Sequence, residues 1–544
     1  MFAKSLTFGV FKSLKNTWQT FKILRRHVNS NALMGKKVDL KDWRTVVGLE
    51  IHCQIDSNSK LFSRAATNYY SAPNTNVSFF DCALPGTLPV LNKRCVEAAI
   101  ISGLALNCAI AKQCTFDRKH YFYADLPSGY QITQYRQPIA KDGYIDYIVS
   151  NGHNDLNSYT KRVPLKQIQL EMDSGKSMRD TEFNRSLVDL NRAGVGLMEF
   201  VFDPVINSPD EAASLVRELS LILKRVGTCS CKMEEGALRV DVNISVHKPG
   251  DQLGTRCEIK NLNSLRSVVH VIEYETIRQI NVIESGGDVV NETRAFDRKS
   301  GQTVPMRDKE VMQDYRFMPE PNLPPIVIKE SRNGECENNP NVFFLEDVQK
   351  LIPRLPNEER QRLKDDYDLS PHNVYKLVED EASVELFEKL MSEKITRDAN
   401  RVAQFLLFDL SKVLDDHKMK LNNCTLSTSS IGECFDLMSS NVITTATACD
   451  VLNILIQGDS RTPTDIVNSN RWHSASEIEK HDICSHTVKV KKYWADRYQK
   501  KGQHFALGKL VSYATNYAEN RISSEDAERI FNEMLQPPKK EDNI

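Results

Sequence analysis

Residues 46–56 read VVGLEIHCQID, and from Val47 onward apolar and polar side chains alternate without a break. Successive side chains of a β-strand point to opposite faces, so this stretch predicts a half-buried strand. Its polar face would carry Glu50 and His52 beside each other. Polar faces of antiparallel sheets are usually just solvated, so this stretch alone does not define a site.

The same alternation recurs in residues 167–173, 238–244 and 256–260. If these strands share one sheet, its polar face collects Glu50, His52, Glu171, Asp173, Asp241 and Glu258. Carboxylates this close would repel one another and take up protons unless a cation lies among them. Oxygen ligands favour a hard cation such as Mg²⁺ over zinc. The pattern therefore indicates metal-assisted phosphoryl transfer as a candidate chemistry.

Length and composition describe an ordinary globular chain. Its 544 residues predict two or three domains, and 40% are apolar and 26% charged. The formal net charge is -1, so any contact with nucleic acid would need a local basic patch. No apolar run approaches the length of a membrane span. The 13 cysteines include no C-x-x-C pair, which favours free thiols in a reducing compartment.

Residues 1–38 contain no Asp or Glu but many Lys and Arg residues interleaved with apolar ones. This acid-free, basic and amphipathic composition is typical of a mitochondrial presequence. The alternative is a basic arm on a cytosolic protein. We expect residues 1–38 to be a presequence and the mature protein to lie in the mitochondrial matrix.

The rest of the chain divides by pattern. Residues 39–328 mix strands with helices that we expect over 93–106, 209–226 and 263–283. Prolines between 319 and 325 then mark a boundary. Beyond it we expect two all-helical domains, residues 340–395 and 396–544.

Three segments combine basic and aromatic or arginine side chains. Residues 116–136, which include Lys119, could stack on bases or fill a core. Arginines between 294 and 316 could clamp a triphosphate or lie on a solvated loop. Residues 489–501 could bind RNA or form a solvated helix face.

The signatures of P-loop, dinucleotide, zincin and hydrolase sites are absent. Several longer motifs instead closely resemble the B subunit of the glutamyl-tRNA(Gln) amidotransferases, in its mitochondrial form. They lie at residues 47–52, 83–92, 116–123, 173–177, 189–192, 232–236, 258–263 and 317–321. The likeness is dense over 43–328 and looser over 340–540.

This resemblance implies an α+β fold for residues 39–328, an antiparallel-sheet cradle similar to glutamine synthetase and guanidino kinases. It also implies that the enzyme amidates glutamate mischarged on tRNA(Gln). In this family, the B subunit activates the γ-carboxylate with ATP, and ammonia from the amidase (A) subunit displaces the phosphate. A small (C) subunit completes the heterotrimer, and the helical tail contacts tRNA.

Residue by residue, the resemblance implies a set of Mg²⁺-binding and catalytic side chains. Glu199 rests on resemblance alone, because Leu197 and Val201 flank it on its own face. Lys119, Arg239 and Arg307 are the expected contacts for ATP or the tRNA end. The set comprises Glu50, His52, Glu171, Glu199, Asp241 and Glu258.

The expected cofactors are ATP and Mg²⁺. Zinc is not expected, since the first strands offer only Cys53 and Cys82 where many family members carry zinc-binding cysteines. No membrane contact is expected. Two alternatives stay open: a non-catalytic tRNA-binding scaffold, and a free-standing ligase similar to glutamine synthetase that acts on a small molecule.

Overall fold

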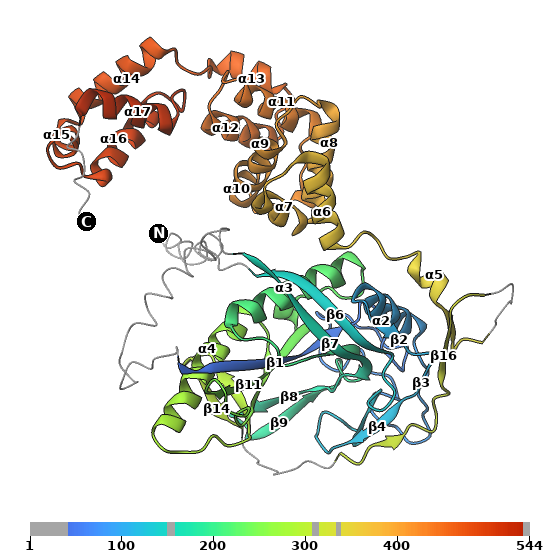
Figure 1. The fold of residues 1–544 in the computed structure, drawn as a ribbon. Helices are drawn as coiled ribbons and strands as arrows, with labels where there is room; N and C mark the ends of the chain where they lie inside the picture. Colours follow the sequence, from blue (N-terminus) through green and yellow to red (C-terminus); the bar gives the residue numbers. More distant parts are fainter. Residues whose placement is uncertain (1–41, 150–157, 307–314, 333–338, 537–544) are drawn as a thin grey trace. The chain divides into compact units, whose positions relative to one another are not determined.

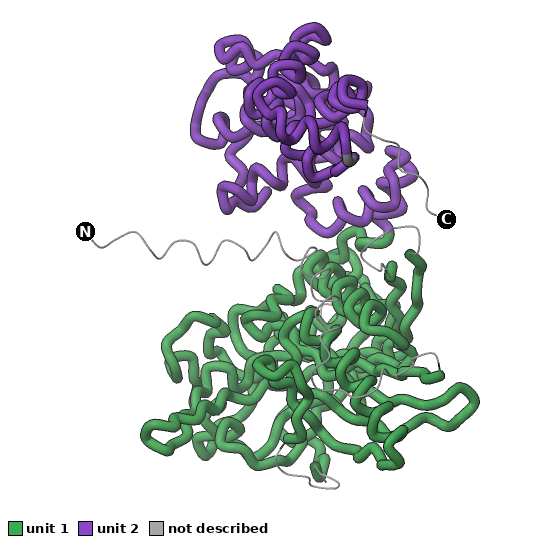
Figure 2. Tube along the Cα trace, turned by 90° about the vertical axis from the view of Figure 1, so that its left-hand side faces the viewer, with its two compact units in different colours: residues 1–357 green, residues 358–544 purple. Residues whose placement is uncertain are grey.

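The computed structural model describes residues 42–149, 158–306, 315–332 and 339–536. The expected presequence and Arg307 lie outside the described residues. The chain divides into two compact units, Met1–Asn357 and Glu358–Ile544 (Figure 2). The first is mixed α/β with a large, mostly antiparallel sheet, and the second is helical.

A twelve-stranded sheet dominates the described part of the first unit (Figure 1). Its main path runs β14-β13-β12-β11-β1-β10-β7-β5-β4-β15, while β6 pairs with both β7 and β2. The central strands are β7 (Tyr159–Met172), β10 (Gly196–Phe202), β1 (Arg44–Gln54), β11 (Leu238–His247) and β12 (Cys257–Leu262). The outer strands are β2 (Ala109–Ile110), β4 (Asp117–His120), β5 (Tyr130–Thr133), β6 (Ala140–Val149), β13 (Thr293–Asp297), β14 (Gln302–Pro305) and β15 (Met318–Pro319).

The pairing is antiparallel except between β12 and β13, which run parallel. The parallel pair is possible because helix α4 separates the two strands along the chain and supplies the crossover. The predicted alternation holds on β1, where Val47, Leu49 and Ile51 are buried while Glu50 and His52 stay partly exposed.

Three helices cover the apolar face of the sheet: α2 (Lys93–Ala105), α3 (Pro209–Arg225) and α4 (Leu265–Glu284). They match the helices expected from the sequence. Ser208 caps α3 by accepting a hydrogen bond from the Glu211 amide, and Ser264 caps α4 in the same way. Their apolar side chains share one core with β1. The opposite, polar face of the sheet is left for a site.

The described part of the first unit also contains two smaller sheets. Strands β8 (Lys176–Asp180) and β9 (Arg185–Asp189) form a hairpin directly after β7. Strands β3 (Gln113–Cys114), β16 (Ile326–Lys329) and β17 (Val342–Phe344) form the other, followed by the short helix α5 (Leu345–Gln349). A 3-10 turn, η3 (Met233–Glu235), precedes β11.

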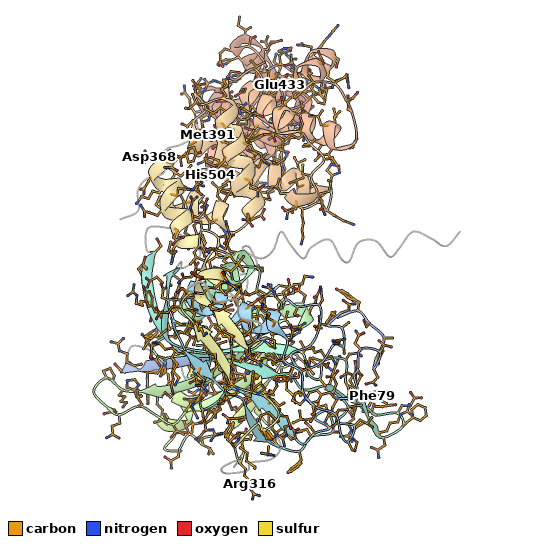
Figure 3. The ribbon with its side chains drawn as sticks, turned by 90° about the vertical axis from the view of Figure 1, so that its right-hand side faces the viewer. Phe79, Arg316, Asp368, Met391, Glu433 and His504 are labelled. Atoms are coloured by element: carbon orange, nitrogen blue, oxygen red, sulfur yellow. The ribbon has the colours of Figure 1, made fainter. Side chains whose placement is uncertain are left out.

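The segment between β1 and α2 is fastened to the sheet by a fully buried ion pair. Lys60 Nζ lies 2.9 Å from Asp81 Oδ2 and also donates to the carbonyl of Leu190 at 3.3 Å. Phe79, from the same segment, projects from the periphery of the unit (Figure 3).

The described residues of the second unit form two hydrophobic cores. The first, which includes Met391 (Figure 3), draws on residues from Leu363 to Val467. The second runs from Cys484 to Leu535. The domain boundary expected at residue 396 therefore lies within the first core, with core residues on both sides of it.

Helices of the first core begin with α6 (Pro356–Tyr367) and α7 (Pro371–Val378), and α7 is capped by Ser370 as its sequence predicts. The others are α8 (Glu381–Glu393), α9 (Ala399–Gln404), the π-helical turn η4 (Phe405–Leu410), α10 (Ser411–Asp416), η5 (Leu421–Asn423), α11 (Thr428–Ser439), α12 (Thr445–Ile456) and α13 (Pro463–Asn470). The second core comprises α14 (Glu477–Val490), α15 (Lys492–Lys501), α16 (His504–Tyr517) and α17 (Ser524–Leu535). None of the described helices is long and apolar enough to span a bilayer.

Candidate active site

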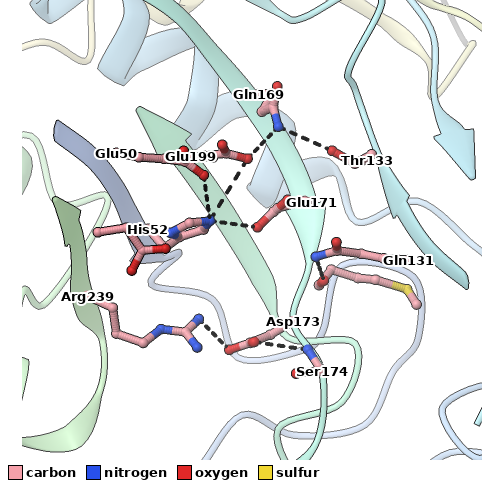
Figure 4. Close-up of polar contacts among 12 residues, drawn as sticks. Glu50, His52, Gln131, Thr133, Gln169, Glu171, Asp173, Ser174, Glu199 and Arg239 are labelled. Atoms are coloured by element: carbon pink, nitrogen blue, oxygen red, sulfur yellow. Dashed lines mark hydrogen bonds and ion pairs between the residues drawn. The ribbon is translucent and has the colours of Figure 1, made fainter. Parts of the chain in front are cut away.

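Strand order brings the polar side chains of β7, β10, β1 and β11 into one row (Figure 4). On β1, His52 lies opposite Glu199 of β10 and, on its other side, opposite Arg239 of β11. Glu50 lies opposite Asp241 in the same way. The antiparallel register therefore concentrates acidic groups around one histidine.

His52 is the centre of this row. Its Nε2 lies 3.3 Å from Glu171 Oε1, 3.9 Å from Glu50 Oε1 and 3.9 Å from Glu199 Oε2. Glu50, His52 and Glu199 each offer one ligand atom, and these atoms lie within 4.8 Å of one another. One cation could therefore contact all three side chains.

Glu199, which the sequence alone could not support, is held firmly in this row. Its carboxylate accepts a hydrogen bond from Nε2 of Gln169, its direct neighbour on β7. Gln169 also donates to Thr133 Oγ1 at 3.4 Å. Sequence reasoning missed Gln169, although the alternation of residues 167–173 already placed it on the face of Glu171.

Burial and neighbouring charges shift the pKa values of the groups around His52. Burial, and next the charge of Glu199, raise the pKa of Glu50 to about 7. Burial lowers the pKa of His52, but the hydrogen bond and charge of Glu171, with other carboxylates, raise it overall to about 10. A protonated His52 thus offsets part of the negative charge. Such a cluster favours binding of a cation.

Asp241 and Glu258 lie further along the row. Burial raises the pKa of Asp241, although His52 opposes the rise, and its Oδ1 accepts a 2.7 Å hydrogen bond from the Asn261 amide. Glu258, opposite Asn243, contacts Lys260 Nζ at 3.4 Å. Glu258 also accepts a 3.0 Å hydrogen bond from a threonine of β13. Glu258 therefore lies on the same sheet but outside the group of Glu50, His52 and Glu199.

The expected basic residues differ in their surroundings. Lys119 on β4 lies over the ring of Tyr315, with Nζ 4.6 Å from the ring centre. Burial raises the pKa of Glu199. The positive charge of Lys119 opposes that rise, so Lys119 lies close enough to stabilise the charged form of Glu199. Arg239 instead donates to Asp173 at 2.8 Å. Arg307 stays a prediction from the sequence.

Comparison with known proteins identifies the family of this chain. Residues 45–333 match the GatB/GatE catalytic domain model, and residues 385–535 match the GatB domain model. The chain is 40% identical over 526 residues to the mitochondrial glutamyl-tRNA(Gln) amidotransferase B subunit of Aedes aegypti, covering 96% of this chain and 99% of that protein.

Other relatives extend the likeness. The mitochondrial glutamyl-tRNA(Gln) amidotransferase B subunit of Homo sapiens is 47% identical over 431 residues, 79% of this chain and 77% of that protein. The aspartyl/glutamyl-tRNA(Asn/Gln) amidotransferase B subunit of Orientia tsutsugamushi is 41% identical over 410 residues, 75% of this chain and 80% of that protein. The chain therefore belongs to the family of glutamyl-tRNA(Gln) amidotransferase B subunits.

Proposed function

We propose that this chain is the activating subunit of a mitochondrial amidotransferase that converts Glu-tRNA(Gln) to Gln-tRNA(Gln). The relatives' names supply the overall reaction and, for those of Aedes aegypti and Homo sapiens, the organelle. The observation that carries the proposal is the group of Glu50, His52 and Glu199 on the polar face of the sheet. A partly buried acidic cluster of this kind suits transfer of a phosphoryl group from ATP to the glutamyl γ-carboxylate.

The donor set fits Mg²⁺. Glu50 and Glu199 supply carboxylate oxygens, and Glu171 and Asp241 lie next to them on the sheet. His52 would first have to lose its extra proton, because only a neutral imidazole ligates a metal. When bound, Mg²⁺ would neutralise phosphate oxygens during transfer. Gln169, by hydrogen bonding to Glu199, would keep that carboxylate in place.

Basic side chains around the row would hold the phosphates. Lys119 approaches from β4, and Lys260 lies at the opposite end beside Glu258. A cavity of about 200 Å³ adjoins Lys260 and is lined also by Asn261, Phe296 and Arg298. Its mixture of an aromatic wall with amide and basic groups suits part of a nucleotide. We place ATP at this end of the row.

In the proposed reaction, a γ-carboxylate oxygen of the glutamyl group attacks the γ-phosphorus of ATP and ADP leaves. Ammonia then attacks the acyl carbon, loses a proton, and phosphate departs. Glu171 and Glu199 are largely buried, which limits the access of water to the acyl phosphate. We infer that ammonia comes from an amidase (A) subunit, with a small (C) subunit completing the complex, in the mitochondrial matrix.

Two finer features belong to the same proposal. The first unit would share the fold of glutamine synthetase and guanidino kinases. The helical tail would contact tRNA through its exposed aromatic and basic side chains. Tyr493 and Phe505 are 62% and 68% exposed, and the Arg497 guanidinium lies 5.5 Å from the Tyr493 ring centre. Such groups can stack on bases and neutralise phosphates.

ATP cleavage by the complex tests the proposal. With the amidase partner present, we expect wild-type cleavage to need both Mg²⁺ and Glu-tRNA(Gln), and Asp241→Asn to reduce it at least tenfold. Asp146→Asn is the control, because Asp146 pairs with Arg162 at the sheet surface, away from the site. Unchanged cleavage in Asp241→Asn would leave this chain as a tRNA-binding scaffold. Turnover of free glutamate without tRNA would instead make it a small-molecule ligase.

A further inference from the structure

Asp173 is a buried carboxylate next to the acidic row that the proposed phosphoryl transfer does not use. It follows the last residue of β7 and is 5% exposed. Its amide donates to the Val195 carbonyl at 2.8 Å, and its carbonyl accepts from the Gly194 amide at 2.9 Å. The backbone therefore fixes Asp173 at the start of the β8–β9 hairpin.

Two arginines meet on this carboxylate (Figure 4 shows the first). Arg239 Nη2 donates to Asp173 Oδ2 at 2.8 Å, and Arg192 Nε lies 3.4 Å from the same oxygen. Asp173 Oδ1 accepts a 2.9 Å hydrogen bond from the Ser174 amide. Arg192 is itself anchored by the carbonyls of Ser174, at 3.0 Å, and Gly175, at 2.6 Å. Arg192 thus supports Asp173 from the hairpin side.

One hydrogen-bond donor of Arg239, its Nε–H, has no partner among the described residues. The Arg239 side chain is 15% exposed, and this Nε–H is buried. A buried donor without a partner costs stability, and a native protein usually provides one, so this exception calls for an explanation such as a ligand that supplies the acceptor. Arg239 lies opposite His52 on the neighbouring strand. A ligand that binds at the acidic row would therefore lie close enough to supply the missing hydrogen-bond acceptor.

We propose that Asp173 is a positioning residue that orients Arg239, so that the Nε–H of Arg239 donates to a phosphoryl oxygen of the substrate. The inference rests on the proposed function. Asp173 holds the guanidinium at Nη2, which leaves the Nε–H to donate to the ligand. A guanidinium carries five N–H donors in a rigid planar fork, so a carboxylate that holds one nitrogen orients the others toward an anionic oxygen.

Asp173→Asn is the most direct variant, because asparagine keeps an oxygen for the Ser174 amide but removes the charge that holds Arg239. In the complex with the amidase partner, we expect kcat/KM for ATP in the tRNA-dependent reaction to fall about ten- to hundredfold, the range for a hydrogen bond to a charged group. Asp180→Asn is the matched control, since Asp180 pairs with Arg185 on the same hairpin. It should behave as wild type.

A double-mutant cycle separates positioning from independent effects. In the Asp173→Asn background, we expect Arg239→Lys to cost less than threefold, although alone it costs as much as Asp173→Asn. Arg192→Gln, further from the row, should give a smaller loss of the same kind. It also keeps the inference testable if Asp173→Asn does not fold.

The inference is overturned if Asp173→Asn lowers only thermal stability and leaves kcat/KM unchanged, or if the two losses multiply. Failure of the proposed function would give a different pattern of results among the variants. In that case Asp241→Asn would also leave ATP cleavage unchanged, whereas failure of this inference alone would leave only the Asp173 and Arg192 variants unaffected.

Discussion

Glu50 holds a carboxylate where burial and the neighbouring Glu199 oppose its charge. A carboxyl pKa raised on folding means that the folded protein binds the proton more tightly than the unfolded chain. The charged form therefore costs stability, and the cost grows as pH rises from about 4.5 to about 7. This is the behaviour expected of a side chain kept for a cation rather than for stability.

Replacing Glu50 by Gln should therefore stabilise the metal-free protein. At pH 8 with a chelator, we expect urea unfolding of Glu50→Gln to give a free energy of unfolding about 1–3 kcal/mol higher than that of wild type. Glu234→Gln is the control, because Glu234 is exposed on η3. Added Mg²⁺ should stabilise the wild type more than Glu50→Gln. A less stable Glu50→Gln protein would refute this description of the site.

At the scale of single residues, the sequence predicted that these acidic side chains share the polar face of the sheet. It did not predict all of their neighbours. Glu199 is flanked by Leu197 and Val201 on its own face, so its local pattern resembles that of a core position. Its place beside His52 is visible only because β10 pairs with β1 and puts the two residues opposite each other. The hydrogen bond between Arg239 and Asp173 likewise joins residues that are 66 positions apart in the chain.

At the scale of elements, faces and helix ends followed from the sequence because both are set locally. Side-chain alternation decides which face of β1 or β7 is buried, and serine caps set the starts of α3 and α7. Strand order was not predictable in this way, because pairing joins segments that are far apart in the chain. The parallel pairing of β12 with β13 is one such result.

The Lys60–Asp81 ion pair makes a prediction at this scale. Burial lowers the pKa of Lys60 and Asp81 opposes that shift, so each charge needs the other. Lys60→Met would leave Asp81 buried without its partner, and its Oδ1 already has none among the described atoms. We expect unfolding of the sheet unit to cost about 3–5 kcal/mol less.

Calorimetry of the two variants Lys60→Met and Lys93→Met would measure this difference. Lys93 forms an ion pair with Glu97 but is 64% exposed, so its replacement should change stability by less than about 1 kcal/mol. Equal effects of the two replacements would show that the buried pair does not fasten the segment between β1 and α2.

At the scale of the whole molecule, the helical unit is expected to serve binding and the sheet unit chemistry. Replacing both Tyr493 and Arg497 by alanine should weaken tRNA binding about 5- to 150-fold, the range for loss of base stacking. The rate of ATP cleavage at saturating tRNA should stay the same. Filter binding would measure the affinity for tRNA, with Phe408→Ala as the control, because Phe408 is an exposed aromatic residue of η4. Unchanged affinity would remove the tail from the RNA contact.

The central claim is that this chain forms the acyl phosphate of glutamate on tRNA. Hydroxylamine in place of ammonia would capture that intermediate as a hydroxamate, with release of phosphate. We predict that the complex forms Glu-tRNA hydroxamate only with ATP and Mg²⁺, and that Glu199→Gln abolishes it while Asp146→Asn does not. Hydroxamate formation that is unchanged in Glu199→Gln would contradict the claim and place the activation outside this acidic row.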